Sequence, residues 1–489
     1  MKINRNDGSS NWEVVSPESV GIPSKAVLGF IDELGQEELC MHGFIMIKDG
    51  KAFAEGYYAP FHTDFAHRMF SIGKSFTSIA IGLLQEEGKL SIHDRICDYF
   101  PDKLPADGAH PYILQTTIRD MLMMASPHQG TTYKLMDSED WIRTFFHFKP
   151  VRYPGTSFVY DTSATHVLSA LVEKLSQMSL LEYLRSKVLD KIGCSDNFRW
   201  LTDPEGICQG GSGLICPLRD LTRVASLCLN DGVYNGEQII PVDYLKEATS
   251  RQIDTSLQPS IDERQGYGYQ FWRTQNNGFA MFGMGGQLAV CLPEYNFLLT
   301  TIADNQHNPN GVQGIYEALW HHILPYLKEN KGAIEIDNLY SKKLQEKISK
   351  LEVSPEKGSL ISPIAAKING KVYSLAPNPT RIVQCHFELN DDEGVFHYTN
   401  NTGEHQIAFG FGKMNQQLFP EINLLSISSA AWVEENKLHL RSFIIEELPA
   451  SVNMTVTFAK NTITFDMRKT AEMKLENYQG FASGEVIEK

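Results

Sequence analysis

This chain of 489 residues has no long apolar run, no cluster of basic residues and no paired-cysteine motif. No segment approaches the roughly 18 consecutive apolar residues of a membrane-spanning helix. The opening residues, Met1 to Asp7, are not followed by the apolar stretch of a signal peptide or anchor. A net charge of −15 disfavours nucleic acid and anionic membranes as partners. We therefore expect a cytoplasmic protein with no membrane or nucleic-acid partner.

Several signatures of enzyme chemistry are also missing. The 8 cysteines are scattered, with no Cys-x-x-Cys pair, which predicts free thiols. There is no His-Glu-x-x-His, no Walker A loop and no Gly-x-Ser-x-Gly elbow, so metalloproteases, P-loop enzymes and α/β-hydrolases are disfavoured. We expect neither a cofactor nor a metal site. The hydrophobic share of 42% is nevertheless ordinary for a globular protein and allows a large buried core.

The most informative stretch of the chain is Ser71-Ile72-Gly73-Lys74. It begins a segment with apolar residues at helical spacing that ends near Gly88, which predicts a buried helix. Positions i and i+3 share one side of a helix, so the Lys74 amine is expected beside the Ser71 hydroxyl. A serine hydroxyl needs such a neighbouring base to become a nucleophile. The pattern is common by chance, and a helix-capping serine beside a solvated lysine is the alternative.

The flanking residues resemble a known family. Residues 69–78 resemble the first motif of the serine β-lactamase and penicillin-binding-protein superfamily, Ser-x-x-Lys. Residues 154–162 resemble the second motif, Tyr-x-Asn. Residues 283–287 resemble the third-motif strand of its class C-like branch of esterases and 6-aminohexanoate-dimer hydrolases. The resemblance covers roughly residues 15–325, with the motifs in the family's order.

The resemblance implies a serine hydrolase that works through a covalent acyl-enzyme. Ser71 would be the nucleophile, Lys74 its base, and Tyr160 a proton shuttle to the leaving group. A neighbouring lysine cation is expected to favour the phenolate of Tyr160. Gly283 would let substrate approach the strand, and the backbone N–H groups of Met284 and Ser71 would form the oxyanion hole.

Two departures from the family pattern bear on the substrate. Thr162 stands where the second motif ends in Asn, and Met281-Phe282-Gly283 replaces a triplet that opens with Lys or His. The missing cation disfavours efficient β-lactam or carboxypeptidase chemistry, because it pairs with the substrate carboxylate. Apolar Met281 and Phe282 favour a neutral, bulky acyl group, with Thr162, Phe282 and Gly283 as substrate-binding residues. The substrate is expected to be an ester, an amide or small peptide, or a β-lactam-like compound. A non-catalytic or acylation-only sensor of the same fold is the alternative.

The pattern of elements predicts two domains joined by a linker. Residues 1–330 are expected to form an α+β hydrolase domain, an antiparallel sheet flanked by helices, with a hairpin at 43–57, helix over 162–192 and a strand at 266–271. Residues 331–369 are polar with prolines and read as a linker. Residues 370–489 alternate with period two and predict an all-β domain, a lipocalin-like barrel or sandwich. That domain would serve stability or dimerisation, or cover the cleft; homodimer formation is left open.

Overall fold

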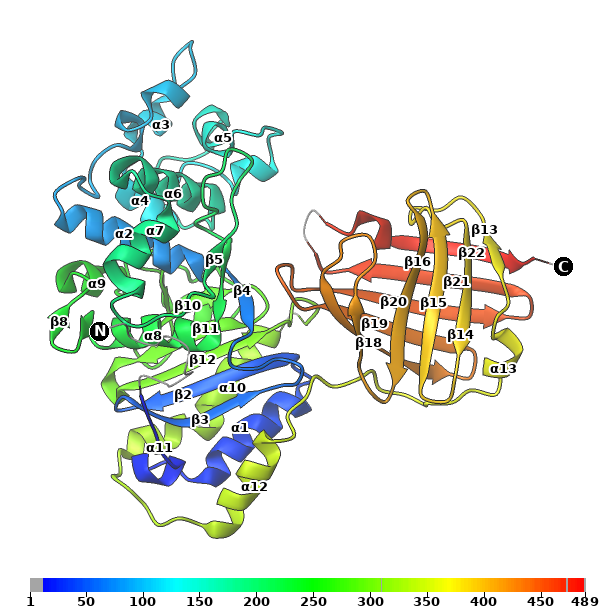
Figure 1. Ribbon diagram of the computed structural model, residues 1–489. Coiled ribbons are helices and arrows are strands. Elements are labelled where there is room, and N and C mark those ends of the chain that lie inside the picture. The colour runs from blue at the N-terminus through cyan, green and yellow to red at the C-terminus, as the bar shows by residue number, and fades with distance from the viewer. Residues whose placement is uncertain (1–11, 309, 472–473, 488–489) are drawn as a thin grey trace. The chain divides into compact units, whose positions relative to one another are not determined.

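The computed structural model describes residues 12–308, 310–471 and 474–487, and it divides into two compact units, Met1–Leu351 and Glu352–Lys489 (Figure 1). The division falls inside the segment 331–369 that the sequence predicts as a linker. In the part of the chain that the structure describes, no helix is both long and apolar enough to cross a bilayer. None of the eight cysteines forms a disulfide, as predicted, and seven of them are buried.

The first unit is built on a seven-stranded sheet. Its order is β1 (Glu13–Val14), β3 (Lys51–Tyr57), β2 (Met41–Lys48), β12 (Phe297–Ala303), β11 (Gln287–Leu292), β10 (Phe279–Gly283) and β9 (Trp272–Arg273). The predicted hairpin is confirmed, and it turns at Asp49 and Gly50, which both take positive φ. Strand β2 pairs with β12 in the register Ile45–Thr300. The two ends of the unit's chain therefore meet in the middle of one sheet.

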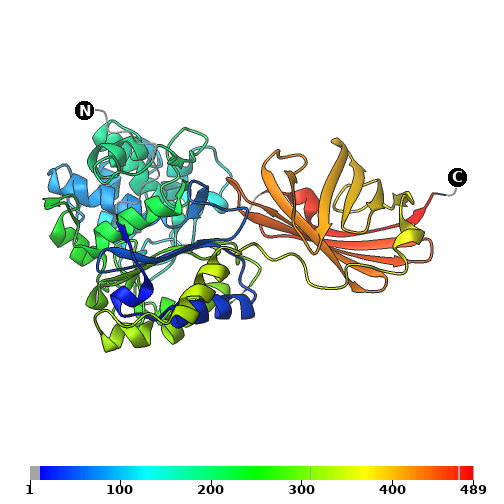
Figure 2. The same ribbon diagram turned by 60° about the horizontal axis from the view of Figure 1, so that its bottom comes forward.

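Helices cover both faces of this sheet, as Figure 2 shows. Strand β2 is buried on both sides, so its alternate residues enter different cores: Phe44 and Met46 on one face, Ile45 and Ile47 on the other. The first core contains residues of α1 (Ser24–Gln36), α10 (Gly311–His322), α11 (Leu324–Glu329) and α12 (Asn338–Ile348). The second contains α2 (Gly73–Glu86), α6 (Thr162–Ser176) and α8 (Leu218–Leu229).

Shorter elements complete the first unit. They are β4 (Ala66–Phe70), β5 (Arg199–Trp200), β6 (Leu214–Pro217), β7 (Val233–Tyr234), β8 (Glu237–Gln238), α3 (Pro111–Gln115), α4 (Ile118–Leu122), α5 (Trp141–His147), α7 (Leu180–Leu184) and α9 (Val242–Ala248). The helix expected over 162–192 is broken, because Gln177 takes positive φ and ends α6. The expected strand 266–271 is wrong: only Tyr267 makes isolated bridges there, and pairing begins at Trp272.

The second unit is a closed β-barrel, which decides between the barrel and the sandwich. Its ten strands follow the order β16-β15-β14-β13-β22-β21-β20-β19-β18-β17, and parallel pairing of β16 with β18 closes nine of them. Alternating burial along strands such as β15 and β21 fills the interior, as period two predicts. Sequence reasoning missed β17 and β22. The elements are α13 (Ala365–Ile368), β13 (Tyr373–Leu375), β14 (Gln384–Leu389), β15 (Glu393–Asn400), β16 (Gly403–Phe411), β17 (Asn415–Leu418), β18 (Leu425–Glu434), β19 (Lys437–Ile444), β20 (Ala450–Ala459), β21 (Thr462–Lys469) and β22 (Gly480–Val486).

Candidate active site

Ser71 lies in the turn between strand β4 and helix α2. The residue before it, Phe70, has a φ of 48°, a left-handed conformation that costs a non-glycine residue on the order of 1–3 kcal/mol. The Ser71 carbonyl accepts a hydrogen bond of 3.0 Å from the Lys74 N–H, and α2 begins at Gly73. Ser71 therefore precedes the first helical turn instead of lying within it, and a strained turn presents it beside Lys74.

The Lys74 amine is buried and surrounded by oxygen atoms. Its side chain is 1% exposed, which contradicts a solvated lysine. Its Nζ lies 3.1 Å from Ser71 Oγ, 3.1 Å from Thr162 Oγ1 and 2.7 Å from the Gly211 carbonyl oxygen. In its neutral form the amine would have two N–H donors, which the Gly211 and Thr162 oxygens can accept, and one lone pair that can take the Ser71 proton.

Gly211 is a site residue that sequence reasoning missed. Strand β6 pairs with β4 in the register Leu214–Phe70, so the chain just before β6 passes alongside Ser71. A Cβ atom on Gly211 would come within 2.6 Å of Thr162 Cγ2 and 3.2 Å of Lys74 Nζ. Only glycine lets this carbonyl reach the amine. The Gly-Gly pair at 210–211 was the available signal.

Thr162, the departure from Tyr-x-Asn, places its hydroxyl beside the Lys74 amine, 3.1 Å from Nζ. It is the first residue of α6, whose N-cap is Asp161: the Asp161 carboxylate accepts from the Ser163 N–H at 2.9 Å. The Thr162 N–H donates to Thr131 Oγ1 at 3.1 Å. The backbone is thus held by other groups, and the Thr162 hydroxyl is available to the Lys74 amine.

Tyr160 is presented from the loop that precedes Asp161. The neighbouring Val159 N–H donates to the Met124 carbonyl at 2.7 Å and fixes this loop. Lys74 Nζ lies 4.8 Å from the centroid of the Tyr160 ring. Burial raises the pKa of Tyr160, opposed by a hydrogen bond with Ser71 and reinforced by the charge of Glu263. The expected phenolate is therefore wrong: removal from water outweighs the nearby amine, and the neutral phenol is the stable form.

An aromatic cluster lies beside Tyr160. The Tyr160 ring stacks on Trp272 with centroids 5.9 Å apart, and Trp272 meets Phe282 at 6.0 Å and Phe158 at 5.5 Å. Phe282, a predicted substrate-binding residue, is only half-buried. Met281 points to the opposite face of the strand, where it is fully buried in the helical core, so its predicted contact with an acyl group is wrong.

Gly283 and Met284 lie at the end of β10, as the third-motif resemblance requires. A Cβ atom on Gly283 would clash with the carbonyl oxygen of Met69, two residues before Ser71. Strand β10 and the turn that carries Ser71 therefore approach as closely as a glycine allows. Gln287 holds the following turn, because its amide donates to the carbonyls of Met284 at 2.8 Å and Ala303 at 2.7 Å.

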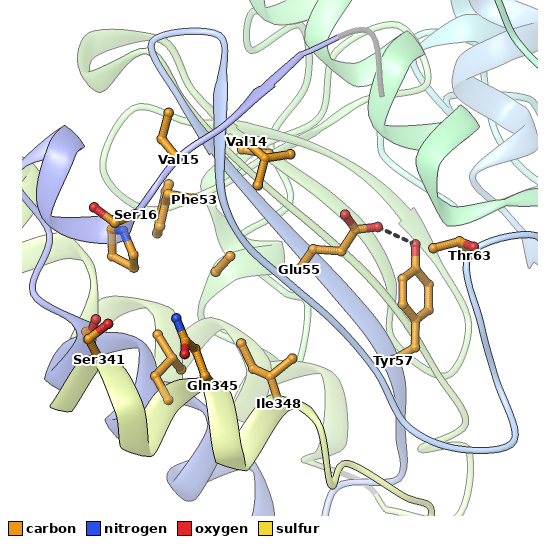
Figure 3. A pocket seen from close by; sticks show the side chains of 15 residues that line it. Val14, Val15, Ser16, Phe53, Glu55, Tyr57, Thr63, Ser341, Gln345 and Ile348 are labelled. Atoms are coloured by element: carbon orange, nitrogen blue, oxygen red, sulfur yellow. Dashed lines mark hydrogen bonds between the residues drawn. The ribbon is translucent and has the colours of Figure 1, made fainter. Parts of the chain in front are cut away.

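A separate groove of the first unit lies between the N-terminal segment, strand β3 and helix α12 (Figure 3). In it the Tyr57 hydroxyl donates to Glu55, whose carboxylate also accepts two hydrogen bonds from Arg219, at 2.7 and 2.9 Å. None of the predicted catalytic residues is among those that line it. The carboxylate is neutralised by its own ion pair, so the groove offers no free charge for chemistry.

Comparison with known proteins identifies the family of the first unit. The family model described as Beta-lactamase matches residues 42–319, more than half of the chain. The 6-aminohexanoate-dimer hydrolase of Paenarthrobacter ureafaciens is 24% identical over 271 residues, which are 51% of this chain and 68% of that protein. A Beta-lactamase of Yersinia enterocolitica is 24% identical over 192 residues, 39% of this chain and 45% of that protein.

Solved structures share the fold at lower identity. A Bacillus anthracis protein, proposed to be a 6-aminohexanoate-dimer hydrolase, superimposes with a TM-score of 0.54 at 19% identity, over 66% of this chain and 89% of that one. The octameric penicillin-binding protein homologue from Pyrococcus abyssi matches with a TM-score of 0.51 at 16% identity, over 94% of this chain and 99% of that one. The second match extends across both units.

Proposed function

Since this chain belongs to the β-lactamase family of hydrolases, we propose that it is a serine hydrolase that forms a covalent acyl-enzyme on Ser71. The observation that carries the proposal is the buried Lys74 amine 3.1 Å from Ser71 Oγ. The residue pattern Ser-x-x-Lys is weak evidence alone, but a 1% exposed lysine aimed at the serine, held by Thr162 and Gly211, is difficult to explain as packing. Burying an amine is costly unless it is neutral or hydrogen-bonded.

In the acylation step the Ser71 oxygen attacks the carbonyl carbon while its proton moves to the neutral Lys74 amine. The carbonyl π electrons move onto oxygen, where the N–H groups of Ser71 and Met284 stabilise the negative charge. Collapse of this intermediate re-forms the carbonyl and breaks the bond to the leaving alcohol or amine. The Tyr160 phenol donates its proton to that leaving group and regains one from the Lys74 ammonium.

Deacylation repeats these steps with water in place of Ser71. Water gives a proton to the base Lys74 and attacks the carbonyl carbon of the acyl-enzyme ester. It displaces Ser71 Oγ, which recovers a proton. A phenol with a raised pKa suits this cycle, because it stays protonated until the leaving group draws its proton. Resting phenolate would lack the proton that the leaving amine or alcohol needs.

The substrate we propose is an ester or small amide with a neutral, apolar acyl part. The half-buried Phe282 and its neighbour Trp272 form an aromatic wall next to Tyr160. The position where relatives place a cation carries Met281, which is buried and cannot bind a substrate carboxylate. We therefore rank β-lactams and peptide C-termini below neutral esters and amides. The amide activity in the name of the Paenarthrobacter relative supports including amides.

An acylation-only sensor of the same fold is the second candidate. Its motivation is the loss of the family asparagine and of the third-motif cation. The hydroxyl of Thr162 counts against it, because it takes the asparagine's position beside Lys74 at 3.1 Å. Deacylation rate separates the two candidates.

The test is labelling followed by turnover. A fluorophosphonate probe should attach to Ser71, as located by peptide mass spectrometry, and Ser71→Ala should abolish both labelling and hydrolysis. A panel of p-nitrophenyl esters, anilides and nitrocefin then ranks the substrates. An adduct on another serine, with Ser71→Ala fully active, would refute the nucleophile. Stoichiometric acylation without turnover would instead favour the sensor.

Self-association is proposed as well, since the Pyrococcus abyssi homologue is described as octameric. A homodimer or larger assembly of this chain predicts a mass that is a multiple of 55.1 kDa. Light scattering coupled to size-exclusion chromatography measures it, and a monomer at all concentrations would refute the proposal.

A further inference from the structure

Two histidines and a glutamate gather on the outer face of the barrel, far in sequence from the serine site. His386 and Glu388 are alternate residues of β14, and His397 is the direct register partner of His386 on the adjacent strand β15 (Figure 1). Residues i and i+2 of a strand share a face, and register partners on neighbouring strands touch. The pairing of β14 with β15 therefore places the three side chains next to one another.

The donor atoms of these side chains lie close together. The two imidazole rings are parallel, with centroids 4.4 Å apart and planes tilted by 5°. His397 Nε2 lies 3.5 Å from one oxygen of the Glu388 carboxylate, and His386 Nε2 lies 3.9 Å from the other. One ligand atom from each residue lies within 4.8 Å of the other two. Both imidazole edges thus face the same carboxylate.

One of these donor atoms is enclosed without a hydrogen bond. His397 Nε2 is inaccessible to solvent and has no hydrogen-bond partner within the described residues 12–308, 310–471 and 474–487. Buried polar nitrogens are nearly always satisfied, so an unsatisfied one next to a second imidazole needs an explanation.

We propose that His386, Glu388 and His397 form a binding site for a divalent transition-metal ion, with Zn²⁺ as the best match. Imidazole and carboxylate ligands suit Zn²⁺, and three protein ligands plus water complete a tetrahedron. Bonds of about 2.0–2.2 Å place ligand atoms roughly 3.4 Å apart. The separations here are 3.5 and 3.9 Å between imidazole and carboxylate, and at most 4.8 Å between any two ligand atoms. To bind one ion, the parallel rings must also turn toward each other, and side chains that are 26% to 63% exposed have room to do so. The ion would tie β14 to β15.

The site is independent of Ser71, and sequence reasoning missed it. The expectation of no metal site rested on the absence of helical His-Glu-x-x-His and of cysteine pairs. His-x-Glu on a predicted strand, followed by a histidine on the next strand, was the overlooked signal. Strand register, which the sequence does not state, decides that His397 lies opposite His386 and not opposite a neighbour.

Zn²⁺ titration of the untagged full-length chain by isothermal calorimetry tests the proposal. We expect one ion bound per chain, no competition by Mg²⁺ or Ca²⁺, and a visible absorption band when Co²⁺ replaces Zn²⁺. His386→Gln and His397→Gln should each weaken binding roughly tenfold or more, and Glu388→Gln at least about threefold. His439→Gln is the matched control, since His439 pairs with a single carboxylate, Glu356, in the same barrel; its affinity should stay within about twofold of wild type.

A second measurement needs no variant. Zn²⁺ should protect His386 and His397 of the wild-type protein from acylation by diethyl pyrocarbonate, as mapped by mass spectrometry, while exposed His93 reacts equally with and without metal. Affinity unchanged in both histidine variants would overturn the site. Unchanged modification of His386 and His397 under saturating Zn²⁺ would overturn it too, even if the variants fail to fold. Unchanged affinity in Glu388→Gln would remove the carboxylate from the ligand set.

Discussion

Replacing Thr162 by valine tests whether the threonine hydroxyl does the work of the family asparagine. Valine has nearly the shape of threonine, so the change removes one oxygen and little else. The Lys74 amine, 1% exposed, would lose the partner that lies 3.1 Å from its Nζ. The fold should survive, because the cap of α6 comes from Asp161 and the Thr162 backbone N–H bonds to Thr131.

The size of the effect follows from that single contact. Removing one partner leaves a buried N–H donor of the amine unsatisfied, which costs about 1–3 kcal/mol, and the buried amine cannot turn to water for a replacement. Since about 1.4 kcal/mol changes a rate tenfold, kcat should fall roughly fivefold to 150-fold. KM for a small neutral ester should change little, because the hydroxyl of Thr162, which the sequence predicts as a substrate-binding residue, contacts the Lys74 amine in the structure.

The measurement is kcat and the rate of fluorophosphonate labelling at Ser71 for a matched series. Thr162→Asn restores a side-chain oxygen for Lys74 and should keep activity within about threefold of wild type. Thr156→Val is the control: its hydroxyl donates to the Tyr153 carbonyl at the surface, and its loss should change kcat less than about twofold. If Thr162→Val keeps full activity with a normal circular dichroism spectrum, the hydroxyl does not hold the base and the reasoning fails.

Four further outcomes are expected. Lys74→Ala and Tyr160→Phe should each cost on the order of 10²-fold in kcat, with the double variant little worse than the poorer single one; additive losses would argue against a shared proton relay. Burial raises the pKa of Tyr160 above its ordinary 10.0, so its phenol should still be protonated in an ultraviolet titration at pH 10. The contribution of this group to the free energy of unfolding is present below that pH and should fall as the pH rises further. Ionisation of Tyr160 at pH 10 would contradict this. Gly283→Ala should clash with the Met69 carbonyl and slow acylation on the order of 10²-fold, whereas labelling at the wild-type rate would place the oxyanion hole elsewhere. A chain ending at Leu351 should remain folded and be labelled by a small probe. A chain ending at residue 330 should be less stable, because it loses α12. If the chain ending at Leu351 is folded but no probe acylates it, the barrel supplies a site residue.

The candidate nucleophile and base could be proposed from sequence because they belong to one short segment. Ser71 and Lys74 are separated by a fixed helical spacing, and Tyr160 follows a Pro-Gly turn with recognisable flanks. The groups that complete the site are distant in sequence and carry no such signature. The Gly211 carbonyl reaches Lys74 only through the pairing of β4 with β6, and a backbone oxygen looks the same in every residue.

The protonation state of Tyr160 and the directions in which Met281 and Phe282 point could not be predicted from the sequence either. A lysine beside Tyr160 suggested a phenolate, but the pKa depends on how much water both groups lose, and that follows from packing. Met281 and Phe282 are adjacent and both apolar. The alternation of β10 sends one into the helical core and the other toward the aromatic cluster, so only the sheet's orientation tells them apart.

By itself the sequence determined the class of this protein: an antiparallel sheet with helices, a buried helix that begins near the Ser-x-x-Lys segment, and an all-β C-terminal part. Hydrophobic periodicity and short motifs are local properties, so each can be recognised within a single segment of the sequence. Tertiary structure alone decided the closure of the barrel by β16 and β18, the three-oxygen environment of Lys74, and the meeting of His386 with His397. Each of these depends on strand register or on contacts between distant segments, because a shift of one residue in pairing turns every side chain to the opposite face.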